Sequence, residues 1–280
     1  RQLSLHELHH GSRAQEKLIF QEVQLDPSRS PRAAAELARS SLQVSLDTQL
    51  SWRTPEETLT QWRNIIQEAG IYVFKAPFHF DPTDGFCLFD SLVPIIFLNN
   101  SKPKNRQIFT LIHELGHILT GNSTITQEDQ RYINNLTGHT LTLETFCNQF
   151  AGEFLMPFRD FTQEYSRLPR LPLLQTASTL ADRYNVSRHA VLVRMRSLAL
   201  ITQNEYESSL SGLYKNGNEK TPPSGGKYYQ NIRTYLGDKY LNLVLGQYYS
   251  GRVSDEQAAG YLGIKARYIP KLEEVVFAST

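Results

Sequence analysis

The chain lacks most features that mark secreted or membrane-embedded proteins. Its 280 residues include only two cysteines, Cys87 and Cys147, which excludes a disulfide scaffold and is typical of a reducing compartment. The longest apolar run, at about residues 92–98, contains Pro94 and is far shorter than the roughly 20 residues that a membrane span needs. The first residues show no basic segment followed by an apolar one, as a signal peptide would have. We therefore expect a cytoplasmic protein without a membrane partner.

Net charge is small as well. Lysine and arginine together number 29, aspartate and glutamate 28, and the formal net charge is +1. The molecule as a whole therefore has no positive field that would draw it onto nucleic acid or an anionic membrane, although a local basic patch is compatible with this charge. Because the sequence begins with Arg1 rather than methionine, we interpret it as a fragment or a processed chain, and a preceding N-terminal module is left open.

Most of the sequence consists of segments whose residue patterns predict α-helices. Thr54 and Glu57 predict a capping box, with Pro55 at the first helical position and Gly70 after the end. Other segments expected to be helical are 31–44, 105–120, 141–157, 173–201 (two helices joined by a tight turn) and 228–277. Short aromatic and β-branched runs predict the strands of a small antiparallel sheet at 71–76, 86–90 and 94–98, with a turn at 81–85.

Two segments match the H-E-x-x-H pattern, which places two imidazoles on one helix face, where both can reach one metal ion. One match runs from His6 to His10 and the other from His113 to His117. The second lies in an apolar helix that closely follows the strand candidates, and such a setting supports a rigid, partly dry metal site. The first has polar neighbours near the end of the chain, so we predict that only the second binds a metal. Two ordinary buried histidines are the alternative, but burying them and Glu114 without partners would be costly.

A catalytic zinc has three protein ligands and one open position, so a third ligand has to come from another segment. The helix expected at 141–157 offers Glu144 and Glu153. At about 100° per residue these two carboxylates lie on opposite faces. The face of Glu144 is mostly small or apolar and can pack against the zinc helix, whereas the face of Glu153 is expected to be wetter. We therefore predict Glu144 as the third ligand, and Asn148, one turn further on, either orients Glu144 or lies on the helix surface.

Together these residues resemble the ImmA/IrrE family of metallopeptidases. The family pattern joins an FTLxHELGH helix to a segment like ExxxNxFAxxLLMP. Here the two stand at 109–117 (FTLIHELGH) and at 144–157 (ETFCNQFAGEFLMP), with Cys147 where alanine is common. The likeness extends over about residues 54–201.

The resemblance implies that His113, His117 and Glu144 bind zinc and that Glu114 is the catalytic base. It also implies a bacterial or phage setting, in which members cleave helix-turn-helix transcriptional repressors. Our leading hypothesis is therefore a zinc-dependent endopeptidase that cleaves such a repressor in a bacterial stress response or mobile-element switch. The alternative is a non-proteolytic toxin or regulator module that uses the zinc fold to bind a partner protein or DNA, although an intact Glu114 argues against it.

The expected fold class is α+β, a zincin-like helical domain with a small antiparallel sheet, followed by helix-turn-helix-like and C-terminal helical segments. We divide the chain into an N-terminal arm and helix (1–50), the zinc peptidase domain (51–165), a helix-turn-helix-like helical segment (166–213), a linker (214–227) and a C-terminal helical domain (228–280).

The helix-turn-helix-like segment is rich in arginine. Asn185 suits a left-handed turn residue and Ser187 a helix cap. Between Ser166 and Leu200 the sequence has six arginines, at positions 167, 170, 183, 188, 194 and 196, against one acidic residue, Asp182. A DNA-reading element, a docking site for an acidic partner and a solvated helical face all fit this pattern, and DNA binding is not the favoured one.

Two further expectations concern the substrate. His139 and Tyr132 lie between the ligand segments and are candidates for stabilising the oxyanion, although a structural role is the favoured interpretation for both. A protein substrate also has to present an extended backbone, and pairing with an exposed strand edge is the simplest way to hold it. Because proline tends to lie at a strand start or edge, we expect Pro94 and residues 95–98 to form that edge, with 86–90 as the next choice.

Overall fold

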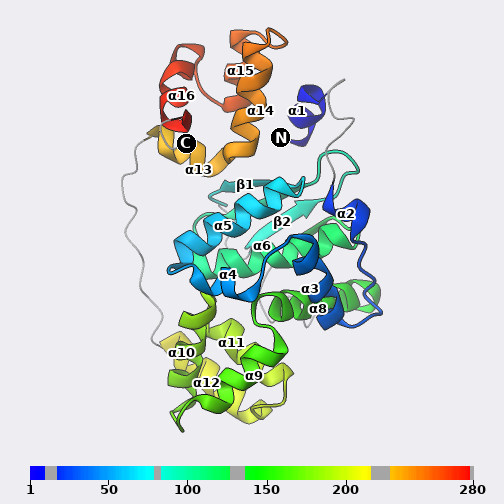
Figure 1. Cartoon of the computed structure of the whole chain (residues 1–280), viewed down its shortest axis with the longest axis vertical. Helices are drawn as coiled ribbons and strands as arrows, with labels where there is room; N and C mark the ends of the chain where they lie inside the picture. The colour runs from blue at the N-terminus through cyan, green and yellow to red at the C-terminus, as the bar shows by residue number, and fades with distance from the viewer. Residues whose placement is uncertain (10–17, 79–82, 127–135, 216–227, 278–280) are drawn as a thin grey trace.

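The computed structural model describes residues 1–9, 18–78, 83–126, 136–215 and 228–277 (Figure 1). Its strands are β1 (Tyr72–Ala76), β2 (Gly85–Leu88), β3 (Ile95–Asn99) and β4 (Thr124–Thr126). Its helices are α1 (Gln2–Leu8), α2 (Ile19–Glu22), α3 (Pro31–Ser41), α4 (Leu46–Ser51), α5 (Pro55–Glu68), α6 (Lys104–Leu119), α8 (Gly138–Leu155), α9 (Phe158–Arg167), α10 (Leu173–Tyr184), α11 (Arg188–Ser197), α12 (Gln203–Lys215), α13 (Tyr228–Leu236), α14 (Asp238–Tyr249), α15 (Asp255–Leu262), the short 3-10 helix η1 (Ala266–Tyr268) and α16 (Ile269–Phe277).

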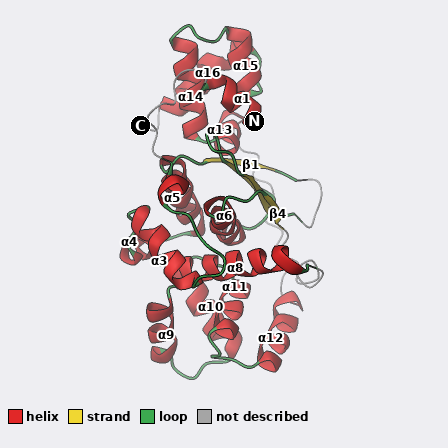
Figure 2. Cartoon of the chain, turned by 90° about the vertical axis from the view of Figure 1, so that its right-hand side faces the viewer, coloured by secondary structure: helices red, strands yellow, loops and turns green. Residues whose placement is uncertain are grey.

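These elements are stacked in layers along the long axis of the molecule. Helices α1 and α13 to α16 lie at one end, above the sheet, and α5 and α6 lie on the other side of the sheet (Figures 1 and 2). Helices α3 and α8 form the next layer, and α9 to α12 lie at the far end. The α+β class expected from the sequence is confirmed.

The sheet is mixed, so the prediction of an antiparallel sheet is wrong in part. The strand order is β1-β3-β2-β4. β2 pairs antiparallel with both β3 and β4, but β1 pairs parallel with β3. The residue pattern of a strand indicates which of its side chains are buried, but it does not indicate whether the strand pairs parallel or antiparallel. The chain passes through β2 between β1 and β3, and this reversal lets β3 return alongside β1 in the same direction.

The predicted substrate edge is also wrong. β3 contains most of the run that begins at Pro94, and it is paired with β1 on one side and β2 on the other. β2, the next choice, is paired with β3 and β4. Among the described strands the outermost are β1 and β4, and β4 is too short to give a recognisable pattern in the sequence.

Alternating side chains on the strands face two different layers. Tyr72, Phe74 and Ile95 are buried with the C-terminal helices, in a cluster that includes Tyr240 of α14. Residues between them in the strands, such as Ile96, are buried in a larger cluster with α5, α6 and α8. The sheet therefore separates two apolar cores.

Two glycines let α6 pack closely on both sides. A Cβ added at Gly85 on β2 would lie 2.6 Å from Cγ2 of Thr110 on α6. A Cβ added at Gly116 on α6 would lie 3.0 Å from Cδ1 of Phe150 and 3.2 Å from Sγ of Cys147, both on α8. α6 is therefore held tightly between the sheet and α8, and it is buried along most of its length.

The N-terminal residues, expected to form an arm, contain short helices that are packed into the fold. Leu5 and Leu8 of α1 are buried in the C-terminal cluster, where α1 contacts α14. Ile19 and Phe20 of α2 are buried in the larger cluster. Helices of this length show no readable periodicity, so their burial is decided by partners that are distant in the sequence.

The turn between α10 and α11 forms as predicted. Asn185 has a φ of 54°, in the left-handed region, and ends α10. The side chain of Ser187 accepts a hydrogen bond from the backbone N–H of Ala190 at 3.0 Å and caps α11. The Asn185 side chain donates to the carbonyl oxygen of Trp52 at 2.8 Å, which ties this turn to the segment between α4 and α5.

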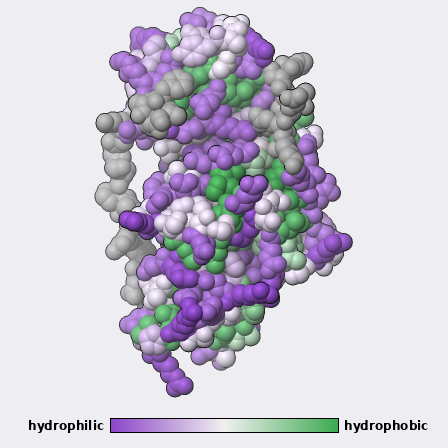
Figure 3. Space-filling model, in the orientation of Figure 1, coloured by the Kyte–Doolittle hydropathy of each residue, from purple (hydrophilic) through white to green (hydrophobic). Residues whose placement is uncertain are grey.

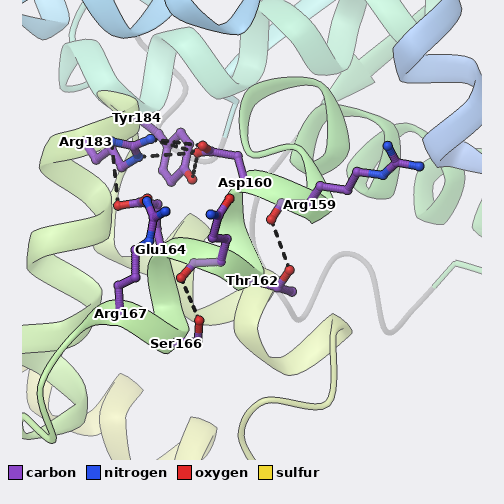
Figure 4. A network of polar contacts seen from close by, with 9 residues as sticks. Arg159, Asp160, Thr162, Glu164, Ser166, Arg167, Arg183 and Tyr184 are labelled. Atoms are coloured by element: carbon purple, nitrogen blue, oxygen red, sulfur yellow. Dashed lines mark hydrogen bonds and ion pairs between the residues drawn. The ribbon is translucent and has the colours of Figure 1, made fainter.

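Several arginines of the same region form ion pairs within the chain (Figure 4). Nη2 of Arg183 on α10 lies 3.0 Å from Oδ2 of Asp160 on α9, and its Nη1 lies 3.8 Å from Glu164. Arg167 pairs with Glu164 at 2.6 Å. These contacts neutralise part of the positive charge that the sequence concentrates here. They also join α10 to α9, a polar helix that the sequence pattern did not predict.

None of the described helices is both long and apolar enough to cross a membrane. The face seen in Figure 3 carries mainly hydrophilic residues, with some hydrophobic residues gathered near the middle of the molecule. Most large apolar side chains of the described segments lie in the two buried clusters instead.

Candidate metal centre

Three donor groups meet where α6 packs against α8. Nε2 of His113 and Nε2 of His117 lie 3.0 Å apart. The carboxylate of Glu144 lies 3.2 Å from the first nitrogen and 3.4 Å from the second. The three side chains belong to residues that are 1%, 0% and 3% exposed. Within the described segments this is the one group of three or more His, Cys, Asp or Glu residues that could hold a metal ion.

The local structure explains why these groups converge. His113 and His117 are four residues apart on α6 and therefore lie on one helix face. Glu144 comes from α8, which approaches that helix closely at Gly116. Burial favours a raised pKa for Glu144, but hydrogen bonds and positive charge from the two histidines outweigh it and lower the pKa to about 2. Glu144 is therefore an anionic oxygen donor at neutral pH.

This donor set fits a zinc ion. Zinc takes imidazole nitrogens and carboxylate oxygens, and catalytic zinc sites have three protein ligands and an open position. His113, His117 and Glu144 supply two nitrogens and one carboxylate, with the ligand atoms within 4.8 Å of one another. A cation would also offset the cost of burying three polar side chains together.

Glu114 follows His113 on α6 and is fully buried. Its Oε2 accepts a hydrogen bond from Oγ1 of Thr124 on β4 at 3.2 Å. Its Oε1 is buried and has no hydrogen-bond partner among the described residues. Thr124 thus holds one carboxylate oxygen, and the other keeps an unfilled hydrogen-bonding capacity in a buried setting.

Sequence reasoning missed Thr124 and its neighbour Cys87. The two residues are paired across β2 and β4, and Sγ of Cys87 lies 3.7 Å from Oγ1 of Thr124. Burial, together with the negative charge of Glu114, raises the pKa of the Cys87 thiol, so the thiol is neutral at pH 7. No signal in the sequence identifies these residues, because only the pairing of β2 with β4 brings them to Glu114.

The described part of the first H-E-x-x-H segment contacts protein groups. Nε2 of His6 lies 2.9 Å from Oδ2 of Asp90. Nε2 of His9 lies 2.7 Å from the hydroxyl of Tyr72 on β1. These contacts attach α1 to the sheet, while His10 lies outside the described residues.

Glu153 lies away from the metal centre, as expected from the helix geometry, but its surroundings are not wet. It is 8% exposed. Oε2 lies 2.7 Å from Nη2 of Arg194 on α11, and Oε1 lies 3.6 Å from Nε of Arg32 on α3. The expectation of a wetter face is wrong because α3 and α11 cover this side of α8.

The remaining candidates from the sequence are not among the donors that meet at the centre. Asn148 is half-buried, and no hydrogen bond joins it to Glu144 among the described residues. His139 is exposed in the first turn of α8. Tyr132 lies outside the described residues.

A helix with the H-E-x-x-H pattern, a glutamate from a second helix and a further buried carboxylate together resemble a site of the metallopeptidase class. Residues 66–196 match the family model Peptidase_M78, described as the IrrE N-terminal-like domain. This part of the chain is therefore similar to that family's domain, and the resemblance to ImmA/IrrE proteins is confirmed. The match supports an enzyme of the metallopeptidase type, and it extends through α11. No curated protein matches the chain.

Proposed function

We propose that the protein is a zinc-dependent endopeptidase, with His113, His117 and Glu144 as the zinc ligands and Glu114 as the base. The observation that carries this proposal is the second carboxylate beside the three donors. Oε1 of Glu114 is buried without a partner in the described part of the chain. A purely structural zinc site is usually closed by four protein ligands and has no need of such a base.

The chain's own groups account for the movement of the proton. When bound, zinc would supply a Lewis acid and activate a water molecule. Glu114 takes a proton from the water as the water attacks the scissile carbonyl, and it passes this proton to the leaving amine. Thr124 holds the other oxygen of the carboxylate, which keeps Glu114 oriented during both transfers.

The proposed substrate is a helix-turn-helix transcriptional repressor in a bacterial stress or mobile-element switch, cleaved in the cytoplasm. The match to an IrrE N-terminal-like domain supports this choice. A non-proteolytic toxin or regulator module is the competing proposal, in which the metal centre serves partner or DNA binding.

One experiment separates the two proposals. The chain is co-expressed with the transcriptional regulator encoded next to its gene, and the regulator is followed by immunoblot and mass spectrometry. Shortening or disappearance of the regulator with the unchanged chain, but not with Glu114→Gln, is the expected result. Measurement of the metal content of both proteins is the control, because Glu114→Gln removes the base and no ligand. An unchanged regulator with a zinc-loaded chain would favour the non-proteolytic module.

A further inference from the structure

A cavity of about 480 Å³ opens beside the metal centre, between α6 and α8 on one side and α11 and α12 on the other. This volume lies within the roughly 300–1,000 Å³ of ligand pockets. Phe109 lies one helical turn before His113 on α6, and Asn148 lies one turn after Glu144 on α8, and both line the cavity. Since one turn is about 5.4 Å long, the cavity begins about one helical turn from the metal donors.

The walls of this cavity are largely apolar. Phe109 contributes an aromatic ring from α6, Ala190 and Val193 come from α11, and Tyr206 comes from α12. Val193 is 39% exposed, whereas the other apolar side chains of α11 are buried. An apolar side chain of a bound molecule would remove this surface from water.

The rim of the cavity carries positive charge and no negative charge. No aspartate or glutamate is among the described residues that line it, whereas Arg196 is. Nε of Arg196 donates to Oε1 of Gln203 at 2.9 Å, and its other N–H groups have no partner within the described ranges. Burial and the charge of Arg106 lower the pKa of His189, so its ring is neutral at pH 7. Arg196 is therefore the cation that a bound molecule would meet.

We propose that this cavity is the side-chain pocket for the peptidase substrate. It takes a large apolar side chain next to the cleaved bond, and Arg196 binds an acidic residue of the same peptide. This inference rests on the proposed peptidase function. The arginine-rich helix α11 then forms one wall of the substrate cleft, in agreement with its place inside the family match at 66–196, and reads no DNA with this face.

The test is a binding measurement on the full, zinc-loaded chain carrying Glu114→Gln, so that no peptide is consumed. The probes are two short fluorescein-labelled peptides, one with a phenylalanine followed by two aspartates and one with lysines in place of the aspartates. Fluorescence anisotropy should show tighter binding of the acidic peptide. Val193→Arg should weaken that binding by about tenfold or more, because it fills the apolar cavity with a charged side chain. Arg196→Glu should reverse the preference in favour of the lysine peptide.

The matched control is Arg188→Glu, which makes the same charge change at an exposed position on α11 outside the cavity lining. It should leave both affinities unchanged. Circular dichroism of each variant verifies the fold. The pocket proposal is overturned if neither peptide binds, if both bind equally, or if Val193→Arg and Arg196→Glu bind them as the parent does.

Cleavage of the same peptides by the chain with an intact Glu114 is measured in parallel. The expected binding pattern without any cleavage would leave the pocket in place and overturn the peptidase function. Cleavage without that binding pattern would do the reverse.

Discussion

The hydroxyl of Thr124 on β4 donates a hydrogen bond to Oε2 of Glu114 on α6, over 3.2 Å. The two residues belong to different layers of the fold, and β4 reaches this position only by pairing with β2. The orientation of the proposed base is therefore set by the edge of the sheet as well as by its own helix.

Loss of this hydrogen bond should slow catalysis. A hydrogen bond to a charged group contributes about 1.5–3 kcal/mol, so Thr124→Val is expected to lower kcat by roughly ten- to a hundredfold. KM and zinc content should not change, because Thr124 is neither a proposed ligand nor part of the cavity lining. Thr124→Ser, which keeps the hydroxyl, is the control in steady-state peptide cleavage. A Thr124→Val protein with unchanged kcat would show that Glu114 is oriented by other contacts.

The metal centre should depend on the second H-E-x-x-H segment alone. We expect one zinc per chain in the unchanged protein, measured by mass spectrometry of the purified protein. His113→Ala or His117→Ala is expected to remove this zinc. Glu114→Gln should retain zinc and abolish cleavage, since it removes the base and no ligand. His6→Ala and His10→Ala should alter neither property. Loss of zinc from the last two variants would mean that the wrong segment has been chosen.

Substitution of the two glutamates of α8 should have different effects on zinc content and on stability. Glu144→Ala is expected to lower zinc occupancy. Glu153→Ala should retain zinc but destabilise the fold by about 3–5 kcal/mol, because it leaves Arg194 buried without its ion-pair partner. Zinc content together with urea unfolding distinguishes the two results. Equal loss of zinc from both variants would contradict the separation of these residues on α8.

Stability should depend on pH through Lys75 on β1, which is 5% exposed. Burial, reinforced by the charges of Arg63 and Lys104 and opposed by Glu56, lowers the pKa of Lys75 from 10.5 to about 7. Between these values the unfolded chain holds a proton that the folded chain has released, so the contribution of Lys75 to stability rises with pH. Below about pH 7 the cost of burying the cation is fully present.

Lys75→Met is therefore expected to be more stable than the wild type at pH 7 and below. The difference should be a few kcal/mol, at about 1.4 kcal/mol for each tenfold change in the ionisation constant, and should shrink as the pH approaches 10. Urea unfolding of both proteins at several pH values measures it. A difference that does not vary with pH would show that Lys75 has an ordinary pKa in the folded chain.

Much of the metal centre could be predicted from the sequence, because its main parts are local. His113 and His117 share a face through helical periodicity alone. The opposite orientations of Glu144 and Glu153 follow from nine residues of helix. Capping residues could also be predicted from the sequence. The cap of α11 at Ser187 and the left-handed turn at Asn185 depend only on neighbouring backbone groups. At α5, Thr54 caps as expected, but the carboxylate of Glu57 bonds to the N–H of Arg53 instead of completing the box.

The rest was decided by contacts between segments far apart in the chain. Local periodicity alone accounts for the helix with the two histidines, the glutamate that faces them and the short strands nearby. Tertiary contacts were needed to establish that β1 pairs with β3 in parallel, that Thr124 reaches Glu114, and that α3 and α11 bury Glu153. Strand pairing and helix packing depend on how well whole surfaces fit together. The neighbours of a residue in the sequence do not determine that fit.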